Sequence, residues 1–257
     1  MKIVYWSDFA CPYCYIGETR LKKAIAQLEE AGEIKPGSIT LEMKAFELEP
    51  YAGEHAEGDT LSRFAKKYKL SDEEAAKKIE SIEQMGRGEG LEFNYSGARS
   101  TNTLDAHRLT KLAQSKGKPV VPGCQIDINA AVGQDSGAGA DEVGGKAPAG
   151  VKTDPDLADR VIDALFHAYI AEGKELADKS VLLEVAEKCG MDTEEVSAML
   201  DSTDFRGEAV FEEKAAAANG IHVVPTFFIG DYMIPGVIEV KQYKEALRDA
   251  LKQNAGS

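Results

Sequence analysis

Apolar and polar positions near the start of the chain follow the pattern of a β-α-β unit. Residues 2–6 form a short β-prone run that stops at Ser7-Asp8. Beyond it, apolar residues recur at helical spacing as far as Gly32. After a Pro36-Gly37 turn, residues 39–46 alternate apolar and polar side chains, which predicts a second strand.

The middle of the chain, from residue 60 to about residue 200, has mainly helical spacing. We expect helices at residues 61–68, 72–85, 102–115, 154–172, 179–189 and 193–200. Asn102 with Asp105, and Asp192 or Thr193 with the glutamates after it, resemble helix-capping pairs. Residues 117–152 break the pattern because they are rich in Gly, Ala, Pro and Val, which predicts a flexible surface loop between two helices.

The last part of the chain predicts a helix, a hairpin and a closing helix. The first helix is expected at residues 205–219. Strands at 226–229 and 232–234 flank a tight Gly230-Asp231 turn, which predicts a β-hairpin. Residues 240–251 have an amphipathic helical pattern. The whole order is therefore βαβ, helices, then αββα.

Composition narrows the possible classes of protein. With 257 residues, of which 43% are hydrophobic and 29% charged, the chain can bury the core of one large domain or of one domain with a substantial insertion. A formal net charge of -14 repels phosphate backbones and anionic lipid, so we expect neither nucleic acid nor membrane as a partner. The first residues hold too few apolar positions for a signal segment, and we expect a cytoplasmic protein.

Two of the four cysteines lie close together in "SDFACPYCYIG", residues 7–17. In a reducing cytosol, such a pair is typical of catalysis or metal binding rather than of a structural disulfide. The pattern places Cys11 at the N-cap of the first helix and Pro12 at its first position, where a missing N–H costs nothing. Cys14 then lies one turn further on, within reach of a mixed disulfide at Cys11.

The N-terminus of a helix favours a thiolate, because its backbone N–H groups lack acceptors and its dipole is positive. Lowering a thiol pKa from about 8.5 to roughly 5.5 changes the thiolate share at neutral pH from a few per cent to nearly all, a difference of about 4 kcal/mol. Zinc binding and a pair of inert buried thiols are the alternatives. Zinc normally needs further ligands, but Cys124 and Cys189 are isolated and the four histidines show no ligand spacing, so we expect no metal.

Four segments, in this order, resemble those of DsbA-family thioredoxin-fold proteins of the FrnE type. They are "SDFACPYCYIG", "NTLDAHRL" (residues 102–109), "EGKELADKSVLLEVAEKCGMD" (172–192) and "GIHVVPTFF" (220–228). This group is related to 2-hydroxychromene-2-carboxylate isomerase and kappa-class glutathione transferase. The resemblance implies an α/β thioredoxin fold interrupted by an inserted all-helical domain. We divide the chain accordingly into residues 1–59, an insertion at 60–204, and 205–257.

The resemblance also implies roles for individual residues. Cys11 would be the nucleophile, Cys14 the resolving thiol, and Val224-Pro225 a cis peptide bond that faces them. The exposed backbone of Val224 would then pair with an extended substrate. Tyr13, beside Pro12, occupies a position where many close relatives have tryptophan and the periplasmic oxidases have histidine, so we expect a less oxidising couple. The isomerase and transferase relatives usually carry serine at the position of Cys11. The cysteine in this chain, together with Cys14, therefore favours dithiol chemistry over glutathione-dependent reactions.

Further candidates for the site have simpler interpretations beside the functional one. His107 is either a substrate contact or a residue of the core. Asn102 is either a substrate contact or the N-cap of a helix. Phe9 either lines an apolar groove beside the thiols or belongs to the core. The same choice holds for the aromatic residues Trp6, Tyr15 and Phe227. Cys124 is either a second redox-active thiol or an exposed thiol without a function. Cys189 is most simply a buried small apolar residue.

The sequence therefore predicts a thiol–disulfide oxidoreductase that reduces, forms or isomerises disulfides through a mixed disulfide. It needs no metal or nucleotide cofactor, but glutathione is a possible co-substrate. The expected partners are protein or small-molecule disulfides, together with glutathione or a thioredoxin-type protein as the reductant. We expect the protein to be a monomer or a homodimer. Two alternatives remain open, namely a glutathione-dependent isomerase or transferase acting on a small aromatic substrate, and a redox-regulated chaperone-like binding protein.

Overall fold

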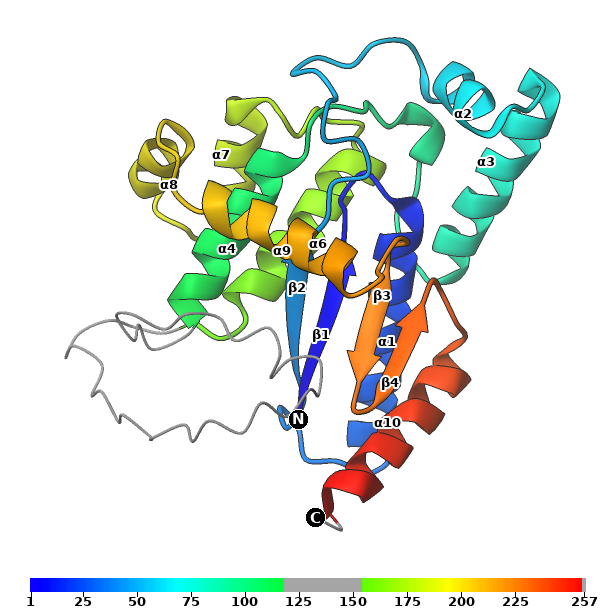
Figure 1. The fold of residues 1–257 in the computed structure, drawn as a ribbon, viewed down its shortest axis with the longest axis vertical. Helices are drawn as coiled ribbons and strands as arrows, with labels where there is room; N and C mark the ends of the chain where they lie inside the picture. Colours follow the sequence, from blue (N-terminus) through cyan, green and yellow to red (C-terminus); the bar gives the residue numbers. More distant parts are fainter. Residues whose placement is uncertain (118–153, 256–257) are drawn as a thin grey trace.

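A computed structural model describes residues 1–117 and 154–255, and its elements follow the predicted order (Figure 1). The predicted loop beyond residue 117, with Cys124, lies outside the described residues. The strands are β1 (Lys2–Ser7), β2 (Thr40–Ala45), β3 (Thr226–Ile229) and β4 (Tyr232–Pro235). The helices are α1 (Pro12–Glu30), α2 (Thr60–Tyr68), α3 (Asp72–Gly88), α4 (Leu104–Gly117), α6 (Leu157–Ile170), α7 (Lys179–Lys188), α8 (Thr193–Leu200), α9 (Arg206–Ala218) and α10 (Val240–Ala255), with a 3-10 turn at Tyr95–Gly97.

The four strands form one sheet in the order β2-β1-β3-β4. β1 and β2 are parallel, with Tyr5 opposite Met43, as a β-α-β connection requires. β1 pairs antiparallel with β3, and β3 with β4 across the predicted hairpin. This is the thioredoxin fold with a helical insertion between its two halves, as the resemblance implied. Among the described helices, none is long and apolar enough to cross a bilayer.

Strand β1 is buried on both faces because helices cover each side of the sheet. Ile3 and Tyr5 point into the main core, where α1 packs against α10. Val4 and Trp6 point to the opposite face and pack against the end of α9 and the residues after it. Successive side chains of a strand alternate between faces, so this single strand joins the two hydrophobic layers.

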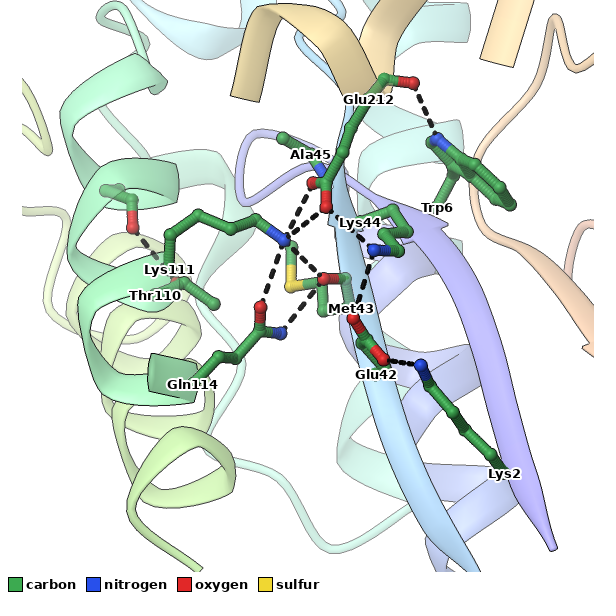
Figure 2. A network of polar contacts seen from close by, with 11 residues as sticks. Lys2, Trp6, Glu42, Met43, Lys44, Ala45, Thr110, Lys111, Gln114 and Glu212 are labelled. Carbon is green, nitrogen blue, oxygen red and sulfur yellow. Dashed lines mark hydrogen bonds and ion pairs between the residues drawn. The ribbon is translucent and has the colours of Figure 1, made fainter. Parts of the chain in front are cut away.

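A buried ionic network joins α4 and α9 to the face of β2 (Figure 2). Glu212 of α9 accepts hydrogen bonds from Lys44 (2.9 Å) and Lys111 (2.8 Å), and its second oxygen accepts one from the Ala45 N–H at 2.7 Å. Lys44 also donates to Glu42 at 3.0 Å. The buried members, two lysines and two glutamates, balance in charge, and the more exposed Lys2 pairs with Glu42 from the edge of the network. The network therefore joins the helical insertion to the sheet.

Candidate active site

The N-terminus of α1 begins directly at the cysteine pair, as the sequence predicted. Cys11 is the N-cap, with an extended backbone, and Pro12 is the first helical residue. The Cys11 N–H donates to the carbonyl oxygen of Asp8 at 3.1 Å, and the Cys14 N–H donates to the carbonyl oxygen of Cys11 at the same distance. The chain thus turns sharply from β1 into α1, and the sulfur of Cys11 belongs to the positive end of the helix dipole.

Asp8 fixes this turn through its side chain, although sequence reasoning did not single it out. Its carboxylate is fully buried and accepts hydrogen bonds from the N–H of Ala10 (3.2 Å), the N–H of Leu48 (2.7 Å) and the hydroxyl of Thr103 (2.9 Å). These donors belong to the active-site loop, the segment after β2 and the start of α4. One buried carboxylate therefore holds three chain segments in register beneath Cys11.

The two thiols have different surroundings, which suits them to different roles. Cys11 is 5% exposed and lines a surface pocket, whereas Cys14 is 0% exposed. Burial raises the pKa of the Cys14 thiol well above its ordinary value, and the neighbouring Cys11 raises it further. Both thiols are free. Cys14 therefore stays protonated at neutral pH, and Cys11 is the more accessible of the two sulfurs.

A cis peptide bond between Val224 and Pro225 faces the pair, as the resemblance implied. The Cys11 thiol donates to the Val224 carbonyl oxygen at 3.6 Å. Helix α1 approaches Pro225 closely because residue 17 is glycine. A Cβ atom at Gly17 would lie 3.0 Å from the Pro225 ring. The proline, the first turn of α1 and the sulfur of Cys11 thus form one packed unit.

A pocket opens beside Cys11, between the active-site turn and α2. Pro12 and Tyr13 form its wall on one side, while Phe64 and Tyr68 contribute from α2. Tyr13 is 40% exposed and Tyr68 is 54% exposed, so aromatic surface surrounds the entrance to the thiol. Pro12 and Tyr13, which the sequence predicted as neighbours of the site, line this pocket. The sequence also predicted the helix α2 but did not place it at the site, because its amphipathic pattern carries no sign of which residues reach the cysteines.

Two predicted substrate contacts do not lie at the surface of the site. Phe9 is fully buried and packs against His107 and Phe166, with ring centroids 5.0 Å apart in both pairs. His107 is also buried, with its Nε2 3.6 Å from Asp8 Oδ1. These side chains support the active-site turn from below, because helices α4 and α6 cover them. The structure thus favours the core interpretation of both residues over direct contact with substrate.

Asn102 lies two residues before α4 begins at Leu104, so it is not the N-cap residue itself, although its side chain bonds the first turn. Its side-chain oxygen accepts the N–H of Leu104 at 2.9 Å, and its amide donates to Glu47 at 2.8 Å. The expected pairing of Asn102 with Asp105 is wrong, because Asp105 bonds Arg108 instead. The Asp192 cap is confirmed by its bonds to the next two glutamate N–H groups.

The remaining aromatic and cysteine candidates are core residues. Trp6, Tyr15, Phe227 and Cys189 are all buried. Across residues 1–117 and 154–255, no cluster of three or more His, Cys, Asp or Glu side chains has the arrangement of a metal site.

The fold and the site together define a class of protein. Residues 2–122 and 149–248 match the family model described as the DSBA-like thioredoxin domain. The chain belongs to this DsbA-like thioredoxin family.

The individual relatives and solved structures share only a low sequence identity with this chain. The protein YwbO of Bacillus subtilis (strain 168) is 23% identical over 255 residues, which is 98% of each chain. A probable DsbA oxidoreductase from Streptomyces coelicolor superposes with a TM-score of 0.76 at 24% identity, covering 98% of this chain and 91% of that one. The structure of 2-hydroxychromene-2-carboxylate isomerase gives a TM-score of 0.61 at 16% identity, covering 100% and 98%. At these identities the likeness to solved structures concerns the fold.

Proposed function

We propose that this protein is a thiol–disulfide oxidoreductase in which Cys11 and Cys14 form the reacting dithiol. The observation that carries the proposal is the contrast between the two thiols. Cys11 caps a helix N-terminus and lines a pocket, while Cys14 is buried and has a raised pKa. An accessible sulfur at a positive helix end suits attack, and a protected sulfur one turn away suits resolution.

In the reductive direction, the Cys11 thiolate attacks one sulfur of a substrate disulfide. A Cys11–substrate disulfide forms, and the other half of the substrate leaves as a thiolate that takes up a proton from water. Cys14 then loses its proton and attacks the Cys11 sulfur, which releases the second substrate half as a thiol. Two electrons pass from the dithiol to the substrate, and the enzyme retains a Cys11–Cys14 disulfide.

The reverse sequence of steps would oxidise or rearrange protein thiols. Under this proposal, glutathione or a thioredoxin-type protein restores the dithiol after each reductive turnover. A working reductant needs a compartment that keeps its thiols reduced, so we place the activity in the cytoplasm. The carbonyl of Val224, next to Cys11, would align an extended substrate by main-chain hydrogen bonding.

A trapping experiment tests the proposal. Cys11→Ser should abolish reduction of a disulfide substrate, whereas Cys14→Ser should accumulate a mixed disulfide at Cys11 that mass spectrometry detects. Cys189→Ser is the matched control, because Cys189 lies at the end of α7 outside the pocket. Full turnover by Cys11→Ser would remove Cys11 from the role of nucleophile.

A further inference from the structure

The pocket beside Cys11 contains a guanidinium group without a carboxylate partner. Arg63 on α2 lines this pocket together with Cys11, Tyr95 and Ser100. Its Nη1 atom is buried and has no hydrogen-bond partner. No carboxylate in the described part of the chain forms an ion pair with Arg63, although acidic residues outnumber basic ones, 44 to 30. An unpaired charge in a sheltered position is costly, and proteins usually keep one for a ligand or a substrate.

The other charges around the pocket are already engaged. Lys67, one turn further along α2, pairs with Glu49 at 2.9 Å. The carboxylate of Asp59, one turn before Arg63, accepts the Ser62 N–H at 2.7 Å as the N-cap of α2, and the charge of Arg63 helps to lower the pKa of this exposed carboxyl. Among the residues that the structure describes, no carboxylate forms an ion pair with Arg63, although its charge acts on Asp59 at the exposed start of α2.

Arg63 and Cys11 share a neighbour, which places the charge close to the reacting sulfur. Burial raises the pKa of Tyr95, and Cys11 raises it as well, while Arg63 acts in the opposite direction. Burial also raises the pKa of Tyr169 to about 12, and Arg63 again opposes the shift. Arg63, Tyr95 and Cys11 line the same pocket, and the charge of Arg63 acts on both Tyr95 and Tyr169.

A guanidinium presents its N–H groups as a planar fork that matches a carboxylate. The formal net charge of -14 repels anions from the molecule as a whole, so an anionic substrate needs a local cation to bind. We propose that Arg63 determines substrate specificity by binding a carboxylate of a small disulfide while Cys11 attacks the nearby sulfur. The substrate class is therefore low-molecular-weight disulfides with a carboxylate a few bonds from the sulfur. This inference rests on the proposed function and uses the same thiol exchange steps.

Two disulfides that differ only in their end groups test this specificity. Bis(2-carboxyethyl) disulfide carries carboxylates, and bis(2-hydroxyethyl) disulfide is neutral. In Arg63→Gln, the ratio of kcat/KM for the first disulfide to that for the second should fall about ten-fold, the loss typical of one charge-assisted contact. Arg63→Lys should restore part of the ratio, since it keeps the charge and loses the fork.

Lys66→Gln is the matched control, because Lys66 is exposed on the same helix, does not line the pocket, and its loss changes the net charge equally. Its ratio should equal that of the wild type. An equal fall of both rate constants in Arg63→Gln would overturn the specificity role, and so would the same fall in Lys66→Gln.

A binding measurement separates this inference from the proposed function. Cys11→Ser binds a disulfide without reacting, so calorimetry can compare it with Cys11→Ser/Arg63→Gln for bis(2-carboxyethyl) disulfide. The second protein should bind about ten-fold more weakly. Equal binding, or no binding by either protein, overturns the role of Arg63. If the wild type reduces neither disulfide but this difference in binding persists, the proposed function fails while the carboxylate site stands.

Discussion

The thiol of Cys11 lies 3.6 Å from the carbonyl oxygen of Val224, a residue 213 positions later in the chain. The sheet produces this contact, since β1 pairs with β3 and Trp6 lies opposite Thr226, two residues after Val224. Cys11 follows the end of one central strand, and Val224 precedes the start of the strand beside it. The site therefore depends on the pairing of strands from the two ends of the sequence.

The two thiols should differ in their rates of alkylation. In the reduced protein at neutral pH, iodoacetamide should modify Cys11 more than ten-fold faster than Cys14, because the thiolate is the reacting species and each unit of pKa changes its share about ten-fold. Burial and the raised pKa protect Cys14. Mass spectrometry of peptides after timed quenching gives both rates. Equal rates in the folded protein would contradict the proposed division of roles.

Gly17→Ala should lower both the stability and the disulfide turnover of the protein relative to a glycine-to-alanine change at an unobstructed helical position. The new methyl group would lie 3.0 Å from Pro225 and 3.3 Å from Phe227, so these packed side chains must move by a few tenths of an ångström. Gly88→Ala, near the end of α3, meets no atom within 4 Å and is the matched control.

The control should gain a few tenths to about 1 kcal/mol of stability from helix propensity. Gly17→Ala should lack this gain and should also reduce disulfide turnover. Chemical denaturation and the reductase assay measure the two effects, and equal behaviour of both variants would refute the packing argument.

Glu47 should make the folded state less stable as the pH rises from about 5 to 8. Burial raises the pKa of Glu47 from 4.5 to about 8, and the nearby carboxyl of Glu213 raises it as well. The folded state then binds more protons than the unfolded state between these values, so stability falls as pH increases. Glu47→Gln, which keeps an acceptor for Asn102, should be more stable than the wild type at pH 8–9 and nearly equal to it at pH 5.

The expected gain from Glu47→Gln is below about 1 kcal/mol, because solvent screens the half-buried carboxyl pair. Urea denaturation at the two pH values measures the difference. If the free energy of unfolding changes with pH equally in the wild type and in Glu47→Gln, this carboxyl pair does not titrate between pH 5 and pH 8.

Glu212→Gln should destabilise the protein strongly. The variant leaves Lys44 and Lys111 buried with an excess of positive charge. Removing one partner from such a buried network costs about 3–5 kcal/mol. The control is Glu73→Gln, which breaks an exposed pair with Lys77 on α3 and should cost less than about 0.5 kcal/mol. Similar urea midpoints for the two variants would show that the network adds little to stability.

Local pattern was sufficient to predict most elements of the fold and the cysteine turn. Apolar spacing identified the strands and helices to within a few residues, because a buried face imposes its period on the sequence. The N-cap position of Cys11 followed from a strand, a Cys-Pro step and a helical pattern in direct succession. The cis bond before Pro225 was predicted only through the family resemblance, since most bonds to proline are trans.

Contacts between distant segments could not be predicted in this way. The alternation along β2 assigns Glu42 and Lys44 to a polar face, and such a face usually points to solvent, yet α9 buries both residues. Phe9 and His107 adjoin or belong to family-like motifs, but α4 and α6 determine their burial. Arg63 lies 52 positions beyond Cys11, and only the packing of α2 beside the active-site turn brings the two to one pocket.

The order of the strands has a consequence for synthesis on the ribosome. β1 and the cysteine turn emerge early, but their partner β3 begins at Thr226. Until that segment has left the exit tunnel, the edge of β1 that later pairs with β3 has no neighbour, and the nascent thiols lack the proline that faces them. A chain released early by a premature stop codon would therefore expose its cysteines without their reaction site.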